Sequence, residues 1–113
     1  MKAYLLIFRH ENVTGKVSPE QIQIWMQQQT EWINSIQAQN KFIGGTGLLF
    51  SDAKVVYHHQ TVTDGPFGKG TEMIGGFIHI SAQSIEEAVH FAKGAPVLQG
   101  EGNTVEVREV VHH

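Results

Sequence analysis

Two segments far apart in the chain are apolar on both of their faces. Ala3–Phe8 reads Ala-Tyr-Leu-Leu-Ile-Phe, and Met73–Ala82 reads Met-Ile-Gly-Gly-Phe-Ile-His-Ile-Ser-Ala. A strand with one face in water alternates apolar and polar residues, so continuous runs of this length are typical of strands buried on both faces. The sequence therefore predicts that these two segments are strands in the middle of a sheet.

A helix start signal follows each of these segments. Ser18 is expected to cap a helix, Pro19 to supply a preset φ at its first position, and Gln21 to complete a capping box. A second capping box is predicted at Ser84–Glu87, and Gly94 with Pro96 stops that helix. The first helix is expected to end near Gln39. Apolar residues recur at helical spacing after both starts, at Ile22, Trp25, Met26, Trp32, Ile33 and Ile36 and at Ile85, Ala88, Val89 and Ala92.

The remaining strands complete a recognisable order. Leu48–Phe50 and Lys54–Gln60 are interpreted as a strand pair turned around Ser51-Asp52, and Thr104–Val111 as the last strand. Gly44-Gly45-Thr46-Gly47 is interpreted as a turn. The result is a β-α-β-β-α-β order in one domain over residues 1–113. Whether a small hairpin divides the second strand is left open by the sequence. We therefore predict an α+β, ferredoxin-like fold with an antiparallel sheet and both helices on one face.

That fold leaves one apolar sheet face without cover. The two central strands carry large apolar residues on both sides, while both helices lie on one side. A contiguous exposed apolar patch requires a partner, and the same face of a second copy is the simplest one. We therefore expect a homodimer of stacked sheets.

Composition excludes several classes of protein. Eight Lys and Arg against eleven Asp and Glu give a net charge of −3. The chain therefore has no excess of positive charge with which to bind nucleic acid or an anionic membrane. With no cysteine, the chain has no disulfide, thiol nucleophile or cysteine zinc site. The first apolar segment is too short to span a membrane, and no small-residue cleavage site follows it. A cytoplasmic protein is predicted.

Several spaced segments resemble the DGPF-domain proteins of the YCII-related family, and together they cover nearly the whole chain. They are Leu5–Arg9, Val62–Phe67 with its Asp-Gly-Pro-Phe motif, Glu72–Phe77, Ala92–Pro96 and Val105–Arg108. The resemblance implies a dimeric α+β barrel. It also implies, for some relatives, small ring-processing enzymes that transfer protons in the barrel cleft, and for others an association with sigma factors. In YCII proteins a His after the first strand pairs with an Asp, and Arg9-His10 occupies roughly that region.

Asp64 is the strongest single candidate for chemistry. A carboxylate at the head of a Gly-Pro turn can face a cleft, where partial desolvation raises its pKa toward acid–base use. The alternative is an Asx-type hydrogen bond to the turn backbone. We expect its carboxylate to lie within reach of Arg9, His79 or His10.

Two arginines and a phenylalanine are the candidate ligand-binding residues. Arg9 ends an apolar strand, where it can bind an anionic substrate or pair with Glu106 or Glu109. Arg108 lies on the strand face away from the neighbouring valines, and an ion pair is the simpler role for it. Phe67 belongs to the Asp-Gly-Pro-Phe motif.

The histidines give two further catalytic candidates, His79 and His10. If Ile78 and Ile80 meet the helices, His79 points into the dimer barrel, although a hydrogen-bonded packing role is the simpler one. His10 is placed in a loop. His58 and His59 are placed on opposite faces of a strand and so cannot share one metal. No metal motif occurs, and no phosphate loop or dinucleotide fingerprint fits the glycine-rich segments, so no metal or cofactor is predicted.

The sequence therefore leaves two functions open. One is an enzyme that carries out cofactor-independent acid–base chemistry, of isomerase or lyase type, on a small organic ligand in the barrel cleft. The other is a non-catalytic module that binds a small ligand or regulates a partner such as a sigma factor. Asp64 in a concave pocket with Arg9 or a histidine within reach favours the enzyme, whereas charge on a flat surface favours the module.

Overall fold

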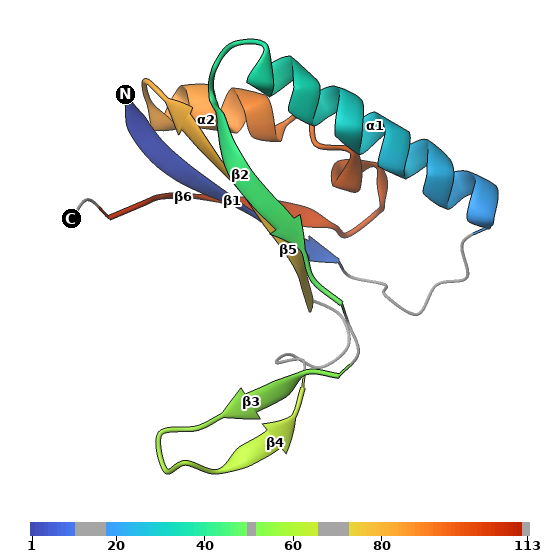
Figure 1. The fold of residues 1–113 in the computed structure, drawn as a ribbon, viewed down its shortest axis with the longest axis vertical. Helices are drawn as coiled ribbons and strands as arrows, with labels where there is room; N and C mark the ends of the chain where they lie inside the picture. Colours follow the sequence, from blue (N-terminus) through green and yellow to red (C-terminus); the bar gives the residue numbers. More distant parts are fainter. Residues whose placement is uncertain (11–17, 50–51, 66–72, 112–113) are drawn as a thin grey trace.

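The computed structural model describes residues 1–10, 18–49, 52–65 and 73–111. Figure 1 shows a four-stranded sheet with two helices above it and a separate hairpin that projects below. The elements are β1 (Lys2–His10), α1 (Pro19–Gln37), β2 (Phe42–Gly47), β3 (Lys54–Val56), β4 (Val62–Asp64), β5 (Met73–Ala82), α2 (Ile85–Ala92), the 3-10 helix η1 (Pro96–Gln99) and β6 (Thr104–Glu109).

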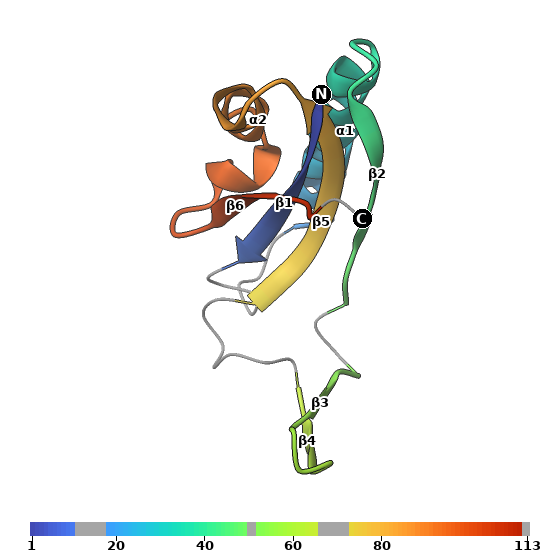
Figure 2. The same cartoon turned by 90° about the vertical axis from the view of Figure 1, so that its left-hand side faces the viewer.

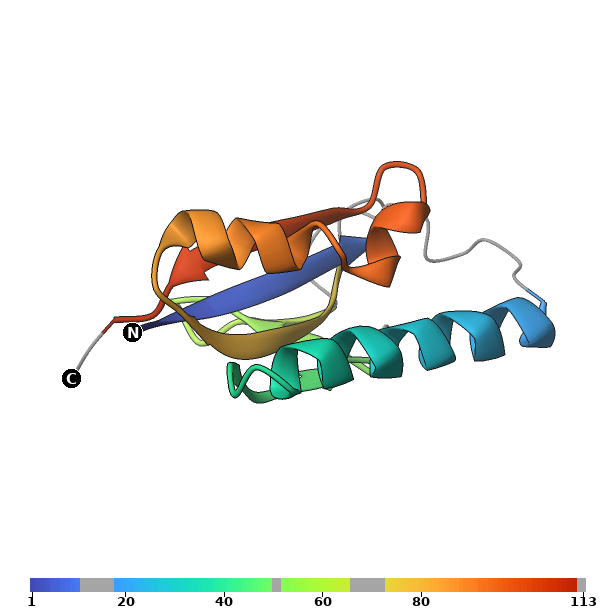
Figure 3. The ribbon, with the colours of Figure 1, turned by 90° about the horizontal axis from the view of Figure 1, so that it is seen from above.

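The strand order of the large sheet confirms the predicted fold. The order is β2-β5-β1-β6 and every neighbouring pair is antiparallel, so β1 and β5 form the centre as predicted. Both helices bury side chains in one core with these strands, and Figure 3 shows them running along the sheet. The fold is therefore α+β and ferredoxin-like.

Side chains of the central strands alternate between two environments. Leu6 and its partner Ile78 lie in the core under the helices, as do Tyr4 and Ile80. The intervening residues are only half-buried and point to the side of the sheet that carries no helix. We call that side the open face; it carries Leu5, Ile7, Arg9, Ile74, Phe77 and His79.

The predicted helix starts are confirmed. The Ser18 hydroxyl accepts a hydrogen bond from the Gln21 amide at 3.1 Å, and the Ser84 hydroxyl accepts one from the Glu87 amide at 3.2 Å. Lys41 Nζ binds Glu87 Oε2 at 2.8 Å. This bond, followed by that of the Gln83 amide, lowers the pKa of Glu87. In the described residues, no helix is both long and apolar enough to cross a membrane.

The helices are attached at their buried ends. In α1, Ile36 is fully buried, and the indole of Trp32 donates a hydrogen bond to the Phe91 carbonyl at 3.0 Å. Trp32 also meets Phe8 edge-to-face, with 6.0 Å between ring centroids. The first half of α1 extends well beyond the end of β1 in Figure 3. The second half of α1 therefore holds the helix on the core.

One glycine-rich segment was misinterpreted from the sequence. Residues 44–47 were taken as a turn, but they belong to β2 and pair with β5. A Cβ at Gly45 would lie 2.5 Å from the Phe77 carbonyl oxygen and 2.8 Å from a methyl group of Ile78. Glycine is therefore required here for close approach of two strands and not for a turn.

The predicted hairpin is also paired differently. The expected strand Lys54–Gln60 was wrong in its length and its partner, because it ends at Val56 and pairs with β4 around residues 57–60. His58 and His59 lie in that turn, not in a strand, and their ring centroids are 3.4 Å apart. We call residues 52–65 the arm, which extends past the end of the four-stranded sheet in Figures 1 and 2. Phe50 and Ser51, at the expected turn, lie outside the described residues.

Two neighbouring glycines test the packing of β2. We expect Gly45→Ala to destabilise the protein by about 1–3 kcal/mol, because its Cβ overlaps the backbone of β5. Gly44→Ala is the control, since nothing lies within 4 Å of a Cβ at that position. Urea unfolding followed by circular dichroism measures both. Equal unfolding free energies for the two variants would contradict the close strand packing.

The open face supports a prediction about assembly. We expect light scattering at micromolar concentration to give close to twice the 12.6 kDa of one chain. Ile7→Glu should disrupt association or folding, because it places an unpaired charge in the apolar part of this face. A stable monomer of the unmodified protein would contradict the stacked-sheet dimer.

Candidate functional site

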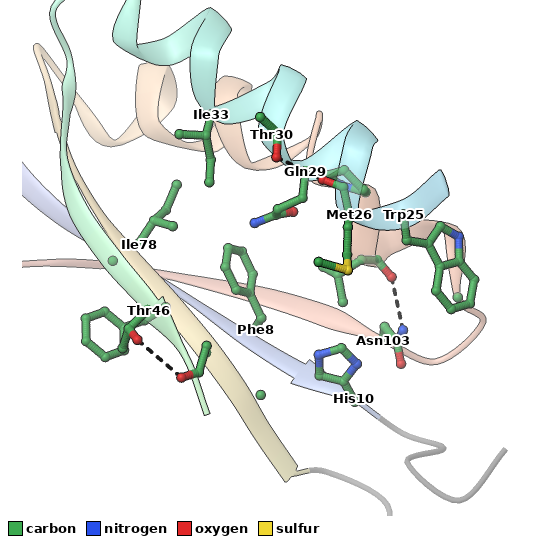
Figure 4. A pocket seen from close by; sticks show the side chains of 18 of the residues that line it. Phe8, His10, Trp25, Met26, Gln29, Thr30, Ile33, Thr46, Ile78 and Asn103 are labelled. Atoms are coloured by element: carbon green, nitrogen blue, oxygen red, sulfur yellow. Dashed lines mark hydrogen bonds between the residues drawn. The ribbon is translucent and has the colours of Figure 1, made fainter. Parts of the chain in front are cut away.

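A cavity of about 550 Å³ lies between the first half of α1 and the helix side of the sheet. Figure 4 shows side chains of α1 pointing across it toward β1 and β5. Because the first half of α1 extends beyond the Trp32 anchor, this part of the helix does not close onto the strands. The space left between them is within the size range of small-molecule sites.

The walls of the cavity are mainly apolar. Aromatic rings come from β1, α1 and β2, and aliphatic side chains lie between them. Met26 is 65% exposed and Ile22 is 45% exposed, so this side of the cavity reaches the surface. The lining residues whose apolar side chains lie on the helix side are Phe8, Ile22, Trp25, Met26, Ile33, Phe42, Ile78, Pro96 and Val97; Phe77 also borders the cavity, but its side chain lies on the open face.

Four glycines line the sheet side of the cavity. Gly45 and Gly47 lie on β2, and Gly75 and Gly76 lie opposite on β5. The register of β1 against β5 shifts between Phe8 and Arg9, beside these glycines. Because glycine has no side chain, this part of the sheet contributes backbone only and leaves the volume empty.

Five polar residues also line the cavity, and none of the described lining residues is Asp, Glu, Lys or Arg. Thr30 donates to the Met26 carbonyl at 3.0 Å, and Asn103 donates through Nδ2 to the Val97 carbonyl at 3.0 Å. Gln29 and His10 are also on the helix side, whereas Thr46 pairs with Phe77 and so turns its side chain to the open face. A site of this kind can orient a ligand by hydrogen bonds but offers no fixed opposite charge.

His10 is the titratable residue of this lining. It is the last residue of β1, lies opposite Met73, and turns to the helix side because it follows Arg9 on the open face. Figure 4 shows its ring beside Asn103 and below Met26. Desolvation lowers the pKa of His10 below its usual value. The imidazole is therefore neutral at pH 7 and able to accept a proton.

The structure places the other predicted site residues elsewhere. Arg9 forms an ion pair with Glu106, one of the two alternatives given by the sequence, and this pair lies on the open face. His79 is also on the open face, because Ile78 and Ile80 meet the helices. The His79 Nε2 atom is buried and has no hydrogen-bond partner among the described residues.

Asp64 lies at the end of β4, on the arm. Its side chain is 86% exposed and forms an ion pair with Lys54. Neither Asp64 nor His79 lines the cavity in the described chain, so a shared site for them stays a prediction. Arg108 is exposed on β6, on the face away from Val105 and Val107, as expected. Phe67 lies outside the described residues.

The cavity itself was missed by sequence reasoning, although its signals are present. Trp25 was assigned to the core or an interface, but it lines the cavity. The first helix carries a longer apolar stripe than its short contact with the sheet needs. Paired glycines at residues 44–45 and 75–76 mark a part of the sheet without side chains. Neither feature alone distinguishes an empty space from a packed one.

A comparison with protein families assigns the chain to a family. The model of the YCII-related domain matches residues 1–112. The chain belongs to the YCII-related family. No curated protein matched the sequence. The narrower DGPF assignment stays a prediction, and part of its motif, Pro66 and Phe67, lies outside the described residues.

A solved structure agrees with the fold over nearly its whole length. This is 5-chloro-2-hydroxyhydroquinone dehydrochlorinase from Burkholderia phenoliruptrix AC1100 in complex with 2,5-dihydroxybenzoquinone. The TM-score is 0.51 at 18% sequence identity, and the match covers 97% of this chain and 95% of the other. At this identity the similarity supports the shared α+β fold and not a shared activity.

The lowered pKa of His10 predicts a pH dependence of stability. In the unfolded chain, His10 binds a proton near pH 6.5. In the folded protein, His10 binds a proton only at lower pH. The contribution of His10 to unfolding free energy is therefore constant above pH 6.5 and falls as the pH drops toward the folded pKa. His10→Gln should remove this fall. Urea unfolding of both proteins between pH 7.5 and 5 measures it, and parallel curves would contradict a desolvated His10.

Proposed function

We propose that this protein is a cofactor-independent enzyme that moves protons on a small uncharged ring compound bound in the cavity, with His10 as the base. The observation that carries the proposal is a neutral histidine in an apolar cavity that is open to a ligand. Apolar walls gain free energy by burying a ring, at about 25 cal/mol per Å² of apolar surface.

The absence of charged lining residues among the described residues restricts the ligand. A carboxylate or phosphate moved into this cavity would lose its hydration without gaining an opposite charge. Arg9, which the sequence offered as an anion anchor, is instead paired with Glu106. An uncharged ligand with hydroxyl or carbonyl groups fits better, because Gln29 and Asn103 offer hydrogen-bonding groups at the wall.

The proposed chemistry is a proton transfer. A neutral imidazole nitrogen of His10 accepts the proton of a ligand hydroxyl or of an activated C–H, leaving an imidazolium and an enolate or phenolate. Return of the proton to a different carbon gives isomerisation. Departure of a leaving group with its electron pair from the anion gives elimination. Both outcomes need neither an oxidant nor a cofactor.

Family and fold support this reaction class. The chain is a YCII-related protein, and the similar solved structure is a dehydrochlorinase that holds a dihydroxylated six-membered ring. A ring of that kind is small, and a cavity of about 550 Å³ accommodates it with room to spare. The alternative function, a module that binds the same ligand class without turnover, uses the same cavity and differs only in the role of His10.

A matched pair of variants tests where the ligand binds. Figure 4 shows Gln29 pointing into the cavity, so Gln29→Trp should fill it, whereas Gln23→Trp adds the same ring to an exposed helix position outside the lining. We expect calorimetry to detect binding of hydroquinone and at least tenfold weaker binding of benzoate. Gln29→Trp should weaken hydroquinone binding at least tenfold and Gln23→Trp should not. Equal binding by both variants would contradict the cavity as the site.

Deuterium exchange tests the catalytic role of His10. Resorcinol in D2O gains deuterium at a ring carbon in three steps: a base removes its hydroxyl proton, the phenolate takes a deuteron on carbon to give the keto form, and the keto form loses the original C–H proton to a base. We expect the protein to accelerate this exchange, as measured by proton NMR, and His10→Gln to abolish the acceleration while hydroquinone still binds. Binding without exchange in the unmodified protein would favour the non-catalytic module. Loss of exchange in Asp64→Asn would assign the chemistry to that carboxylate instead.

A further inference from the structure

The cavity is about twice as long as a single ring. On the sheet side its lining runs from Ile78, which pairs with Leu6, to His10, four residues further along β1. At about 3.3 Å per residue this is about 13 Å. On the helix side Met26 and Ile33 are seven residues apart, or about 10 Å at 1.5 Å per residue. A six-membered ring with oxygen atoms at opposite corners measures about 6 Å from standard bond lengths. One ring therefore fills about half of this length.

Polar side chains lie together at one end of the cavity. Figure 4 shows His10 and Asn103 side by side below Met26. The strand register agrees, because Thr104 pairs with Arg9 and the antiparallel direction brings the preceding residue, Asn103, level with His10. Met26 is mostly exposed, so this end of the cavity meets the surface. The polar groups of a ligand can therefore bind here and keep contact with water.

The other end of the cavity is apolar and is closed by the core. Figure 4 shows Ile33 of α1 and Ile78 of β5 on opposite sides of it. Ile78 is 3% exposed, and Ile33 and Phe42 pack against the buried core. These side chains cannot replace the hydration of a polar group. An apolar group, in contrast, gains free energy by leaving water at this end.

We propose that the ligand is an amphipathic ring compound, with its hydroxylated ring beside His10 and Asn103 and an apolar substituent between Ile33 and Ile78. The ring leaves about 7 Å of the cavity, which an extended chain of about six carbon atoms fills at about 1.3 Å per carbon. This inference rests on the proposed function, because it narrows the substrate class of the same cavity. It places the ring, and not the substituent, next to the proposed base.

A series of 4-alkylresorcinols tests the length of the apolar end. Calorimetry compares resorcinol with its ethyl, butyl, hexyl and dodecyl derivatives, each below the concentration at which it forms micelles. Each fully buried CH2 group strengthens binding about fourfold. We expect the hexyl compound to bind at least about thirtyfold more tightly than resorcinol, and the dodecyl compound to gain little more. Equal affinities for resorcinol and the hexyl compound, or an unbroken rise through the dodecyl compound, would overturn the proposal.

Two tryptophan substitutions on α1 locate the apolar end. Ile33→Trp should fill it and reduce the advantage of the hexyl compound over resorcinol at least tenfold, while resorcinol binds as before. Ile24→Trp is the control, because Ile24 is exposed and outside the lining, and it should change neither affinity. Circular dichroism checks that both variants fold. An unchanged advantage of the hexyl compound in folded Ile33→Trp would contradict the proposed end.

Nuclear Overhauser effects measure the orientation of the ligand in the unmodified protein, so this test does not depend on the folding of any variant. With 4-hexylresorcinol bound, we expect contacts from the terminal methyl group of the chain to the methyl groups of Ile33 and Ile78. A ring proton should contact the imidazole of His10. Contacts of the chain methyl group with His10 instead would overturn the proposal.

Failure of this inference is distinguishable from failure of the proposed function. Binding and deuterium exchange of resorcinol without any gain from the alkyl chain would overturn the inference and leave the proposed function standing. A gain from the chain with the expected contacts, but without deuterium exchange, would leave the inference standing and contradict the catalytic role. Binding of neither resorcinol nor its hexyl derivative would overturn both.

Discussion

The pairing of β1 with β5 is the interaction on which the rest of the structure depends. Leu6 and Ile78 lie opposite each other in the core, and Ile7 and Phe77 lie opposite each other on the open face. One ladder of hydrogen bonds therefore fixes two apolar surfaces at once. The helices cover the first surface. The second is the open face, which carries no helix, so the same pairing that creates the core also creates the surface on which we predict a second chain.

The cavity arises where the packing on this central pair ends. Ile36 and Trp32 hold the second half of α1 on the core, but opposite its first half the sheet offers glycines instead of large side chains. A helix is stiff over this length, so it cannot bend down to fill the gap. His10 stands at this gap because β1 continues two residues beyond Phe8. Its burial follows from strand length and not from a dedicated binding motif.

Much of the fold could be predicted because its determinants are local. The apolar runs, Ser18 and Ser84 specify strands and helix starts from residues that are adjacent in sequence, and the structure agrees with them. The pairing of β2 could not be predicted in this way. From the sequence alone, Gly45 is typical of a turn. Only the structure shows that the backbone of β5 approaches it closely. The cavity could not be predicted in this way either, because four elements form it together: α1, β1, β2 and β5. Asp64 was predicted as a site residue from its sequence motif, and a motif does not tell which residues Asp64 contacts.

β2 links the candidate site to the arm. Gly47 lines the cavity, and the next residue, Leu48, donates its amide hydrogen to the Gly75 carbonyl at 2.9 Å before the chain leaves for the arm. Because three of the six residues of this strand are glycine, few side chains help to hold it, and backbone hydrogen bonds fix its position. The same bonds therefore set the sheet side of the cavity and the point from which the arm departs. A substitution that separates β2 from β5 at Gly45 is therefore expected to change the sheet side of the cavity.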